Sequence, residues 1–254
     1  MFFLFHSARL HGWKWFVVSV ENSAGSLTRM LVEFYHKTAI KHLSQSQIMD
    51  AMIFIEKHFD IVDNQNSYNY LDVLAMGEKL WNAKKIDGIF IDPYNALELD
   101  EGLLKTYGDH NYHYRVTSAF RNFTKKHDCC IYLNCHAVTE ALRRTWGKDN
   151  APDSEVIGHP MPPKKSDIEG GGKFANRADD FLIIHRYTQH KSLYRVTEIH
   201  VVKTKETETG GKNTPLSEPI KLTLADGNCN FLPYGFHEIY EDEPSATFIE
   251  KPPF

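Results

Sequence analysis

The sequence predicts an α/β protein with a mostly parallel central sheet flanked by helices, followed by an antiparallel extension. Apolar, strand-like segments alternate with segments long enough to hold a helix, and shorter strands separated by a glycine turn follow them. The first group of strands is predicted at Trp15–Val20, Phe59–Val62, Ile86–Asp92, Ile131–Cys135 and Phe181–His185, and the second at Thr197–Lys203, Ile220–Leu224 and Asn230–Leu232.

Helical spacing of apolar residues fills the intervals between the first strands. Phe2–Leu10 is interpreted as part of a buried helix rather than a signal peptide, because no basic residue precedes it and His6 and Arg9 interrupt it. Apolar residues recur at helical intervals at Leu27, Met30, Leu31 and Phe34, at Val116, Phe120 and Phe123, and less regularly at Leu71, Leu74 and Leu80.

Composition limits the classes of protein that the chain can represent. With 29 basic and 33 acidic residues among 254, the net charge of -4 excludes a global positive field for nucleic acid, so any such binding must use local basic loops. The four cysteines include no CxxC pair, which favours reduced thiols and an intracellular location. No apolar stretch reaches the roughly 20 residues that cross a bilayer. We therefore expect a cytoplasmic protein, in the host cytoplasm if a phage encodes it.

A long polar segment from Thr145 to Gly172 separates the two groups of strands. At its end, three glycines permit close backbone approach to a ligand, and basic residues surround them, as binding to single-stranded nucleic acid requires. A solvated loop without a ligand is the open alternative. The candidate DNA-binding residues are Lys164, Lys165, Gly170, Gly171, Gly172, Lys173 and Arg177. We expect residues 1–238 to form one domain and the acidic, Pro-rich residues 239–254 to form a tail.

Two carboxylates follow predicted strands. Asp92 ends a buried apolar run, and Glu21 comes directly after the first strand. Because ligands of open α/β sheets bind at the carboxyl ends of the strands, Asp92 is placed to hold the water shell of a nucleotide-bound Mg²⁺. Glu21 is the candidate base for an attacking water. The alternatives are that Asp92 only starts a turn and that Glu21 only favours the start of a helix.

Other polar residues extend this pattern, each with a structural alternative. His136 follows the predicted strand 131–135 and could sense a γ-phosphate, although it could equally be a satisfied polar residue. Lys203 and Lys205 alternate at a strand end, so both point to one side, where they could reach a phosphate across a subunit boundary. They could also be solvated lysines of an edge strand.

The order of these motifs resembles the RecA-like motor domain of hexameric replicative DNA helicases of superfamily 4, in the branch of phage primase-helicases and mitochondrial Twinkle. The phrases that carry the resemblance are His11-Gly12-Trp13-Lys14, Ser19-Val20-Glu21-Asn22, Phe90-Ile91-Asp92-Pro93-Tyr94-Asn95 and Phe174-Ala175-Asn176-Arg177-Ala178-Asp179. The resemblance covers about residues 1–234.

The resemblance implies ATP-driven translocation on single-stranded DNA by a ring, by default a hexamer, with ATP and Mg²⁺ held between subunits. It assigns Glu21 as the catalytic glutamate, Asp92 as the Walker B aspartate and His136 as the γ-phosphate sensor. Arg186, at a strand end, joins the nucleotide site, and the basic loop lines the central pore. Lys205 occupies the position of an arginine finger, with Lys203 as its basic partner. A lysine supplies charge without the bidentate fork of arginine.

One part of the family pattern is missing from these 254 residues. No GxxxxGK followed by Ser or Thr occurs, and the glycine run before Lys173 does not qualify, because Asp167 and Phe174 occupy its first and last key positions. In the family, the strand before this P-loop lies in the middle of the sheet. We hypothesise an internal start or a split gene, with a separate or upstream P-loop or primase segment. The upstream DNA sequence tests this idea.

The preferred function is therefore the motor domain of a replicative DNA helicase that is inactive, or binds ATP only feebly, as the isolated chain. One alternative is a RecA-like recombinase or regulatory ATPase that does not unwind DNA. A second alternative is a non-catalytic DNA-binding or ring-assembly subunit. The helicase interpretation requires Glu21 and Asp92 to meet at one site.

Overall fold

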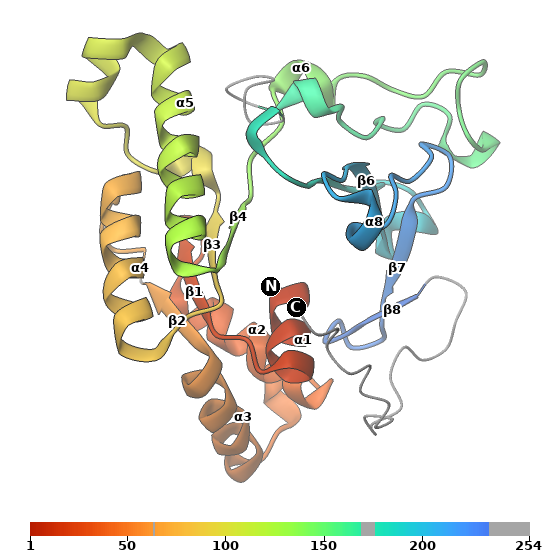
Figure 1. Cartoon of the computed structure of the whole chain (residues 1–254). Coiled ribbons are helices and arrows are strands. Elements are labelled where there is room, and N and C mark those ends of the chain that lie inside the picture. The colour runs from red at the N-terminus through yellow and green to blue at the C-terminus, as the bar shows by residue number, and fades with distance from the viewer. Residues whose placement is uncertain (63, 169–175, 234–254) are drawn as a thin grey trace.

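Two four-stranded sheets form the chain, in a computed structural model that describes residues 1–62, 64–168 and 176–233 (Figure 1). The first sheet is parallel in the order β2-β1-β3-β4, and the second is antiparallel in the order β5-β6-β7-β8. This arrangement confirms the predicted fold class. The strands are β1 (Trp15–Ser19), β2 (Phe59–Val62), β3 (Gly88–Asp92), β4 (Cys130–Leu133), β5 (Phe181–Arg186), β6 (Val196–Lys203), β7 (Ile220–Leu224) and β8 (Phe231–Pro233).

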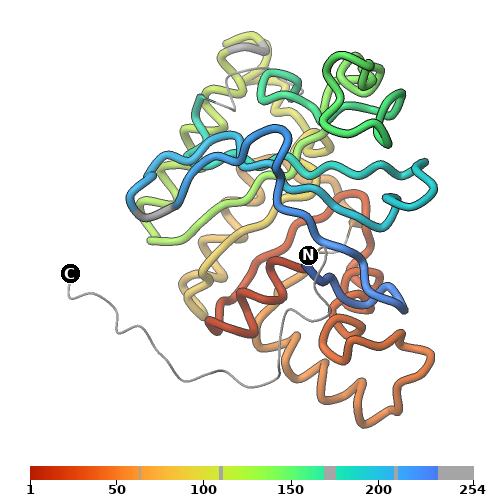
Figure 2. Tube along the Cα trace, turned by 90° about the vertical axis from the view of Figure 1, so that its right-hand side faces the viewer, coloured from red at the N-terminus to blue at the C-terminus, as the bar shows by residue number. Residues whose placement is uncertain are grey.

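One strand differs from the prediction in its partner. The apolar run at 181–185 was expected to join the parallel group, but β5 pairs antiparallel with β6 and starts the second sheet. An apolar run indicates a buried strand without specifying its neighbour, because pairing depends on contacts far apart in the sequence. In Figure 1 the second sheet lies beyond β4, and Figure 2, viewed from that side, shows it in front of the first sheet.

Helices cover both faces of the parallel sheet. One face packs against α1, α2 and α3, and the other against α4 and α5. Their bounds are α1 (Phe2–His11), α2 (Ala24–His36), α3 (Gln45–His58), α4 (Tyr70–Lys84) and α5 (Glu101–His127), with an interruption of α5 at Gly108. Shorter helices are α6 (Thr139–Leu142) and α8 (Thr207–Gly210), with 3-10 turns η1 (Ile40–His42), η2 (Tyr94–Ala96), η3 (Ser154–Val156), η4 (Lys165–Asp167) and η5 (Leu193–Arg195). The helix predicted at Phe2–Leu10 is confirmed.

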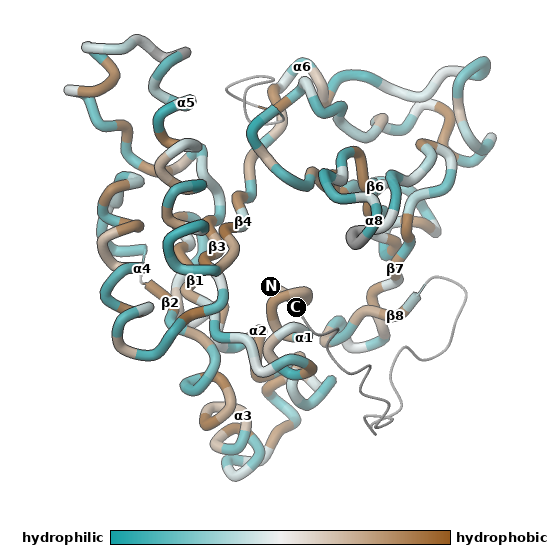
Figure 3. Tube along the Cα trace, in the orientation of Figure 1, coloured by the Kyte–Doolittle hydropathy of each residue, from teal (hydrophilic) through white to brown (hydrophobic). Residues whose placement is uncertain are grey.

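The centre of the fold is β1, every residue of which is buried. Phe16 and Val18 point to the side of α4 and α5, whereas Trp15 and Val17 point to the side of α1–α3. A strand buried on both faces requires continuous apolar residues, which explains the run in the sequence. Figure 3 shows the apolar colouring of β3 and β4 and the largely hydrophilic α5. No helix in the described part of the chain has both the length and the apolar character needed to cross a membrane.

The segment predicted as a polar loop contributes a small core beneath the antiparallel sheet. Trp146 and Val156 are buried there with Tyr187, and the Trp146 indole N–H donates to the Tyr187 hydroxyl at 3.1 Å. Burial raises the pKa of Tyr187 to about 12. The Pro-rich composition had suggested solvent exposure, but isolated apolar residues anchor this segment to the sheet. The expected tail 239–254 lies outside the described residues.

His6 makes stability depend on pH in the acid range. It lies on α1 against Phe2 and Phe5, and burial, aided by the charges of Arg9 and Lys37, lowers its pKa from 6.5 to about 4. Because the unfolded chain takes up this proton first, stability present above pH 6.5 is lost as the pH falls toward 4. After allowance for partial exposure, we expect a loss of roughly 1–3 kcal/mol.

Urea unfolding at several pH values checks this prediction. His6→Gln should flatten the pH dependence between pH 6.5 and about 4, the interval set by the two pKa values. His11→Gln, at the exposed end of the same helix, is the control and should follow the parent chain. Equal curves for His6→Gln and the parent would contradict the assignment.

Candidate functional site

The carboxyl edge of the parallel sheet brings the two predicted carboxylates together. β1 and β3 are neighbours with Ser19 opposite Asp92, and the Val20 N–H donates to the Asp92 carbonyl at 3.0 Å. Glu21 comes one residue later. The two acids, separated by a long stretch of sequence, therefore lie on adjacent strand ends.

Two residues after β4 connect these acids. Asn134 donates from its side-chain amide to Asp92 Oδ1 at 2.5 Å, and His136 Nε2 lies 3.7 Å from Glu21 Oε1. The Glu21 and His136 side chains are each 53% exposed, so the pair is accessible to a ligand. The segment after β4 thus contacts both carboxylates.

The polypeptide that carries His136 is itself fixed to the end of β3. Asn95 Oδ1 accepts from the His136 N–H at 2.9 Å, and the Tyr94 N–H donates to the Asn134 carbonyl at 2.7 Å. Sequence reasoning did not assign a role to Asn95, and it gave Asn134 only a possible phosphate contact. Their position just after strand ends was the available signal, but the partners depend on the strand order.

The structural alternatives for the two acids have different outcomes. Ser23 caps α2 by accepting from the Ser26 N–H, and the Asn22 N–H donates to Ser19, so Glu21 does not serve as the cap. Its side chain meets His136 instead. Asp92 does precede a turn, because η2 begins at Tyr94, while its carboxylate also accepts from Asn134.

The start of α1 lies against this edge of the sheet. Burial lowers the pKa of the Met1 amino group, and the nearby charge of Asp92 partly opposes that effect. No Lys or Arg side chain in the described residues forms an ion pair with Glu21 or Asp92. Carboxylate oxygen is the ligand type that Mg²⁺ prefers, and one carboxylate with phosphates and waters is a common set. The described residues contain no group of three or more His, Cys, Asp or Glu placed to bind a metal alone.

Lys203 and Lys205 contact the segment that follows the glycine loop. Lys203 Nζ donates to the Ala178 carbonyl at 2.5 Å, and Lys205 Nζ lies 3.0 Å from Asp179 Oδ1. Arg121 pairs with the same carboxylate. Burial acts to raise the pKa of Asp179, but the hydrogen bond from Lys205 and the charge of Arg121 outweigh it and lower the pKa.

The remaining predicted residues lie apart from the carboxylates. Arg186 donates to the Tyr194 carbonyl at 2.7 Å, and the Arg177 guanidinium lies 3.6 Å from the centre of the Tyr114 ring. Lys164 and Lys165 lie at the start of η4, where the Lys164 N–H donates to Asp167. Gly170, Gly171, Gly172 and Lys173 lie outside the described residues.

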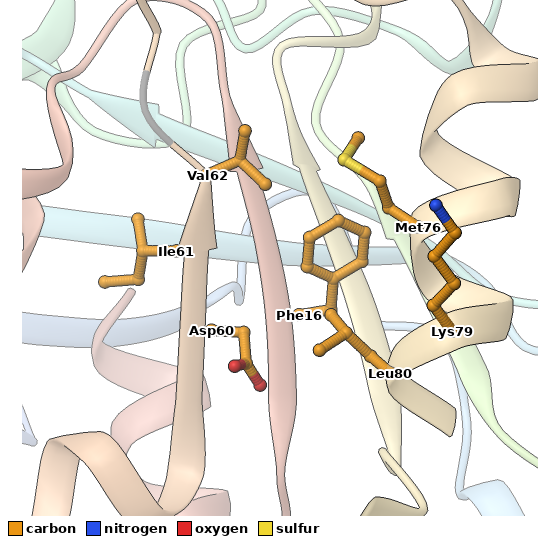
Figure 4. A pocket seen from close by; sticks show the side chains of 7 residues that line it. All are labelled: Phe16, Asp60, Ile61, Val62, Met76, Lys79 and Leu80. Atoms are coloured by element: carbon orange, nitrogen blue, oxygen red, sulfur yellow. The ribbon is translucent and has the colours of Figure 1, made fainter. Parts of the chain in front are cut away.

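A groove of about 350 Å³ lies on the flank of the sheet, between β2 and α4 (Figure 4). Phe16 forms part of its apolar wall, and Asp60 and Lys79 supply polar groups. None of the predicted site residues lines it. The full lining is Phe16, Asp60, Ile61, Val62, Met76, Lys79 and Leu80.

Solved structures identify the class of this fold. One of them, an isolated ATPase domain, superposes with a TM-score of 0.66 at 13% identity, covering 88% of this chain and 75% of that chain. A DnaB-like replicative helicase, solved with a description of its interactions with primase, gives a TM-score of 0.63 at 14% identity, covering 87% of this chain and 50% of that one. The chain has the RecA-like fold of replicative helicase ATPase domains, which confirms the resemblance found in the sequence.

Among curated proteins, the chain is similar to the Twinkle homolog protein, chloroplastic/mitochondrial, of Arabidopsis thaliana. The two are 24% identical over 186 residues, which is 69% of this chain. The chain spans 24% of the length of that relative. No protein-family model matches the chain. Together, these similarities support a helicase-like motor domain.

Proposed function

We propose that the chain is the motor domain of an ATP-driven DNA helicase that moves along single-stranded DNA. The observation that carries the proposal is the meeting of Glu21 and Asp92 at one edge of a RecA-like sheet, with His136 beside Glu21. Nucleotide hydrolysis needs one acid for the metal and one for the attacking water. The similarity to replicative helicase ATPase domains gives the same direction.

Each residue at this edge has a separate task in the proposal. Asp92 holds the water shell of Mg²⁺, and Asn134 fixes the orientation of its carboxylate. Glu21 orients and deprotonates the attacking water, while His136 links Glu21 to the state of the γ-phosphate. Mg²⁺ neutralises the charge that develops on the phosphate oxygens. Arg186, Lys203 and Lys205 complete a nucleotide site that is shared with a neighbouring subunit of a ring.

DNA binding is assigned to the basic loop in the same proposal. Lys164, Lys165, Lys173 and Arg177, with the glycines at 170–172, grip the backbone of single-stranded DNA inside a hexameric ring. The motor extends over residues 1–238, and residues 239–254 form a tail. A P-loop or primase segment acts with the chain in the cytoplasm, as a phage replication protein would require.

A second candidate function is a non-catalytic DNA-binding or ring-assembly subunit. The observation that favours it is the lack of a GxxxxGK motif in the 254 residues. The contacts of Lys203 and Lys205 with residues 178 and 179 also give both lysines a structural task. A RecA-like recombinase or regulatory ATPase would share the carboxylate pair but would not unwind DNA.

Unwinding of forked DNA separates these functions. The chain, alone and joined to a strand and P-loop at its N-terminus, is assayed for ATP hydrolysis with and without single-stranded DNA. We expect the joined protein to hydrolyse ATP, to be stimulated by DNA and to unwind the fork. Stimulated hydrolysis without unwinding favours the recombinase or regulatory ATPase. DNA binding with no hydrolysis in either protein favours the non-catalytic subunit.

A further inference from the structure

One edge of the parallel sheet has backbone groups that face away from its neighbour. The N–H groups of Cys130 and Asn134 donate toward β3, to the carbonyls of Asp87 at 3.0 Å and Ile91 at 2.9 Å. Because successive residues of a strand alternate direction, the N–H groups of Ile131 and Leu133 point to the opposite side. Within the described residues, β4 pairs with no strand on that side. β4 is also only half-buried, in contrast to β1.

A second open edge belongs to the antiparallel sheet. β5 pairs with β6 alone among the described strands. Leu182 and Ile184 on β5 are 50% and 69% exposed, which is unusual for apolar residues in the interior of a strand. Long, apolar, unpaired edges readily pair with another strand.

Helix α1 runs from one sheet to the other and leaves an apolar residue uncovered. The ring of Phe3 packs 5.7 Å from that of Tyr132 on β4, and the ring of Phe2 lies 5.0 Å from that of Phe231 on β8. Phe3 nevertheless remains 59% exposed. The charge of Asp180, just before β5, also reaches Tyr132, which places the start of β5 near β4. The open edges of β4 and β5 therefore belong to the same part of the molecule.

We infer that an apolar β-strand, contributed by a polypeptide segment outside residues 1–254, docks between β4 and β5 and joins the two sheets into one. Only an extended backbone satisfies unpaired groups along two strand edges at once. Its side chains would lie beside Tyr132 and Phe3 at one edge and beside Leu182 and Ile184 at the other. The lengths of β4 and β5 set the docked strand at four to six residues.

Charge indicates the kind of loop into which this strand leads. If the strand runs parallel to β4, it ends at the same sheet edge as Asp92 and Asn134. That edge presents two carboxylates, and no Lys or Arg side chain in the described residues pairs with either of them. A triphosphate needs backbone N–H donors and a cation there. The occupant is thus a strand that leads into a glycine-rich, lysine-containing loop; this last step rests on the proposed function, whereas the docking of the strand does not.

Amide hydrogen exchange with a synthetic peptide tests the docking. The probe is a soluble peptide with five Val or Ile residues followed by GxxxxGKS, added to the 254-residue chain. We expect exchange at Ile131 and Leu133 and along β5 to slow by about tenfold or more, with a higher Tm. A peptide of the same composition with N-methyl groups on alternate strand residues cannot pair and should give no protection.

Two protein variants locate the contact. Ile131→Pro removes an N–H that does not bond to β3, which an edge strand tolerates, and it should abolish the protection. Ile131→Ala keeps the N–H and should retain it. If Ile131→Pro does not fold, the N-methylated peptide gives the same comparison on the unchanged chain. Equal protection by both peptides, protection only at the β2 edge, or none at β4 would overturn the inference, as would pairing of two chains through β4 on sedimentation.

A further peptide separates this inference from the nucleotide function. Replacing the loop lysine of the peptide by alanine should leave the protection of β4 intact but prevent any gain in binding of fluorescent ATP. If the unaltered peptide protects β4 and β5 without promoting ATP binding, the docking stands and the proposed nucleotide site fails. If ATP binds without protection of β4, the docking fails while the nucleotide site stands.

Discussion

Replacing Glu21 with glutamine is expected to lower DNA-stimulated ATP hydrolysis by about 10²–10⁴-fold in the chain joined to a P-loop segment. Glutamine keeps the size of the side chain but cannot accept a proton from water. Because Asp92 and its contact with Asn134 remain, nucleotide and Mg²⁺ binding should change little. Single-turnover hydrolysis and equilibrium binding of fluorescent ATP measure the two effects separately.

A surface glutamate provides the matched control for this change. Glu56→Gln, at an exposed position of α3, should leave both hydrolysis and binding unchanged. His136→Asn should reduce hydrolysis less than Glu21→Gln, because it removes the neighbour of the base and leaves the base itself. Unchanged hydrolysis in Glu21→Gln would show that this carboxylate is not the base and would favour the non-catalytic function.

Replacing Gly88 with alanine is expected to destabilise the fold by about 1–3 kcal/mol or more. A Cβ at this position would lie 2.2 Å from Trp15 Cζ3 and 2.8 Å from Cys130 Sγ. Trp15 is fully buried and its indole N–H donates to Ser7 at 2.9 Å, so the ring cannot move aside without losing packing and a hydrogen bond. Urea unfolding followed by circular dichroism measures the change in free energy.

A double-mutant cycle identifies the cause of this loss. In a Trp15→Leu background the ring is absent, so Gly88→Ala should cost clearly less than in the parent chain. Gly25→Ala is the control within α2, because a Cβ there meets nothing within 4 Å and alanine favours the helix. An equal cost for Gly88→Ala in both backgrounds would place the strain somewhere other than at Trp15.

Features that depend on neighbouring residues could be predicted from the sequence. The strands around Val17 and Ile89 were recognisable because a strand buried on both faces must be apolar throughout. The positions of Glu21 and Asp92 at one sheet edge followed from the same reasoning, since parallel strands share the edge at which they end. These conclusions need only local periodicity and the rule that parallel strands align.

Contacts between distant segments needed the tertiary structure. The placement of β5 in the antiparallel sheet and the attachment of Lys205 to Asp179 leave no local trace in the sequence. The same holds for the contact of Asn134 with Asp92, which exists only because β4 lies beside β3. The amino-acid sequence alone determined the class of fold and the acids at its edge. Strand order and side-chain partners were decided by packing, because many pairings satisfy the same local pattern and only the assembled core selects one.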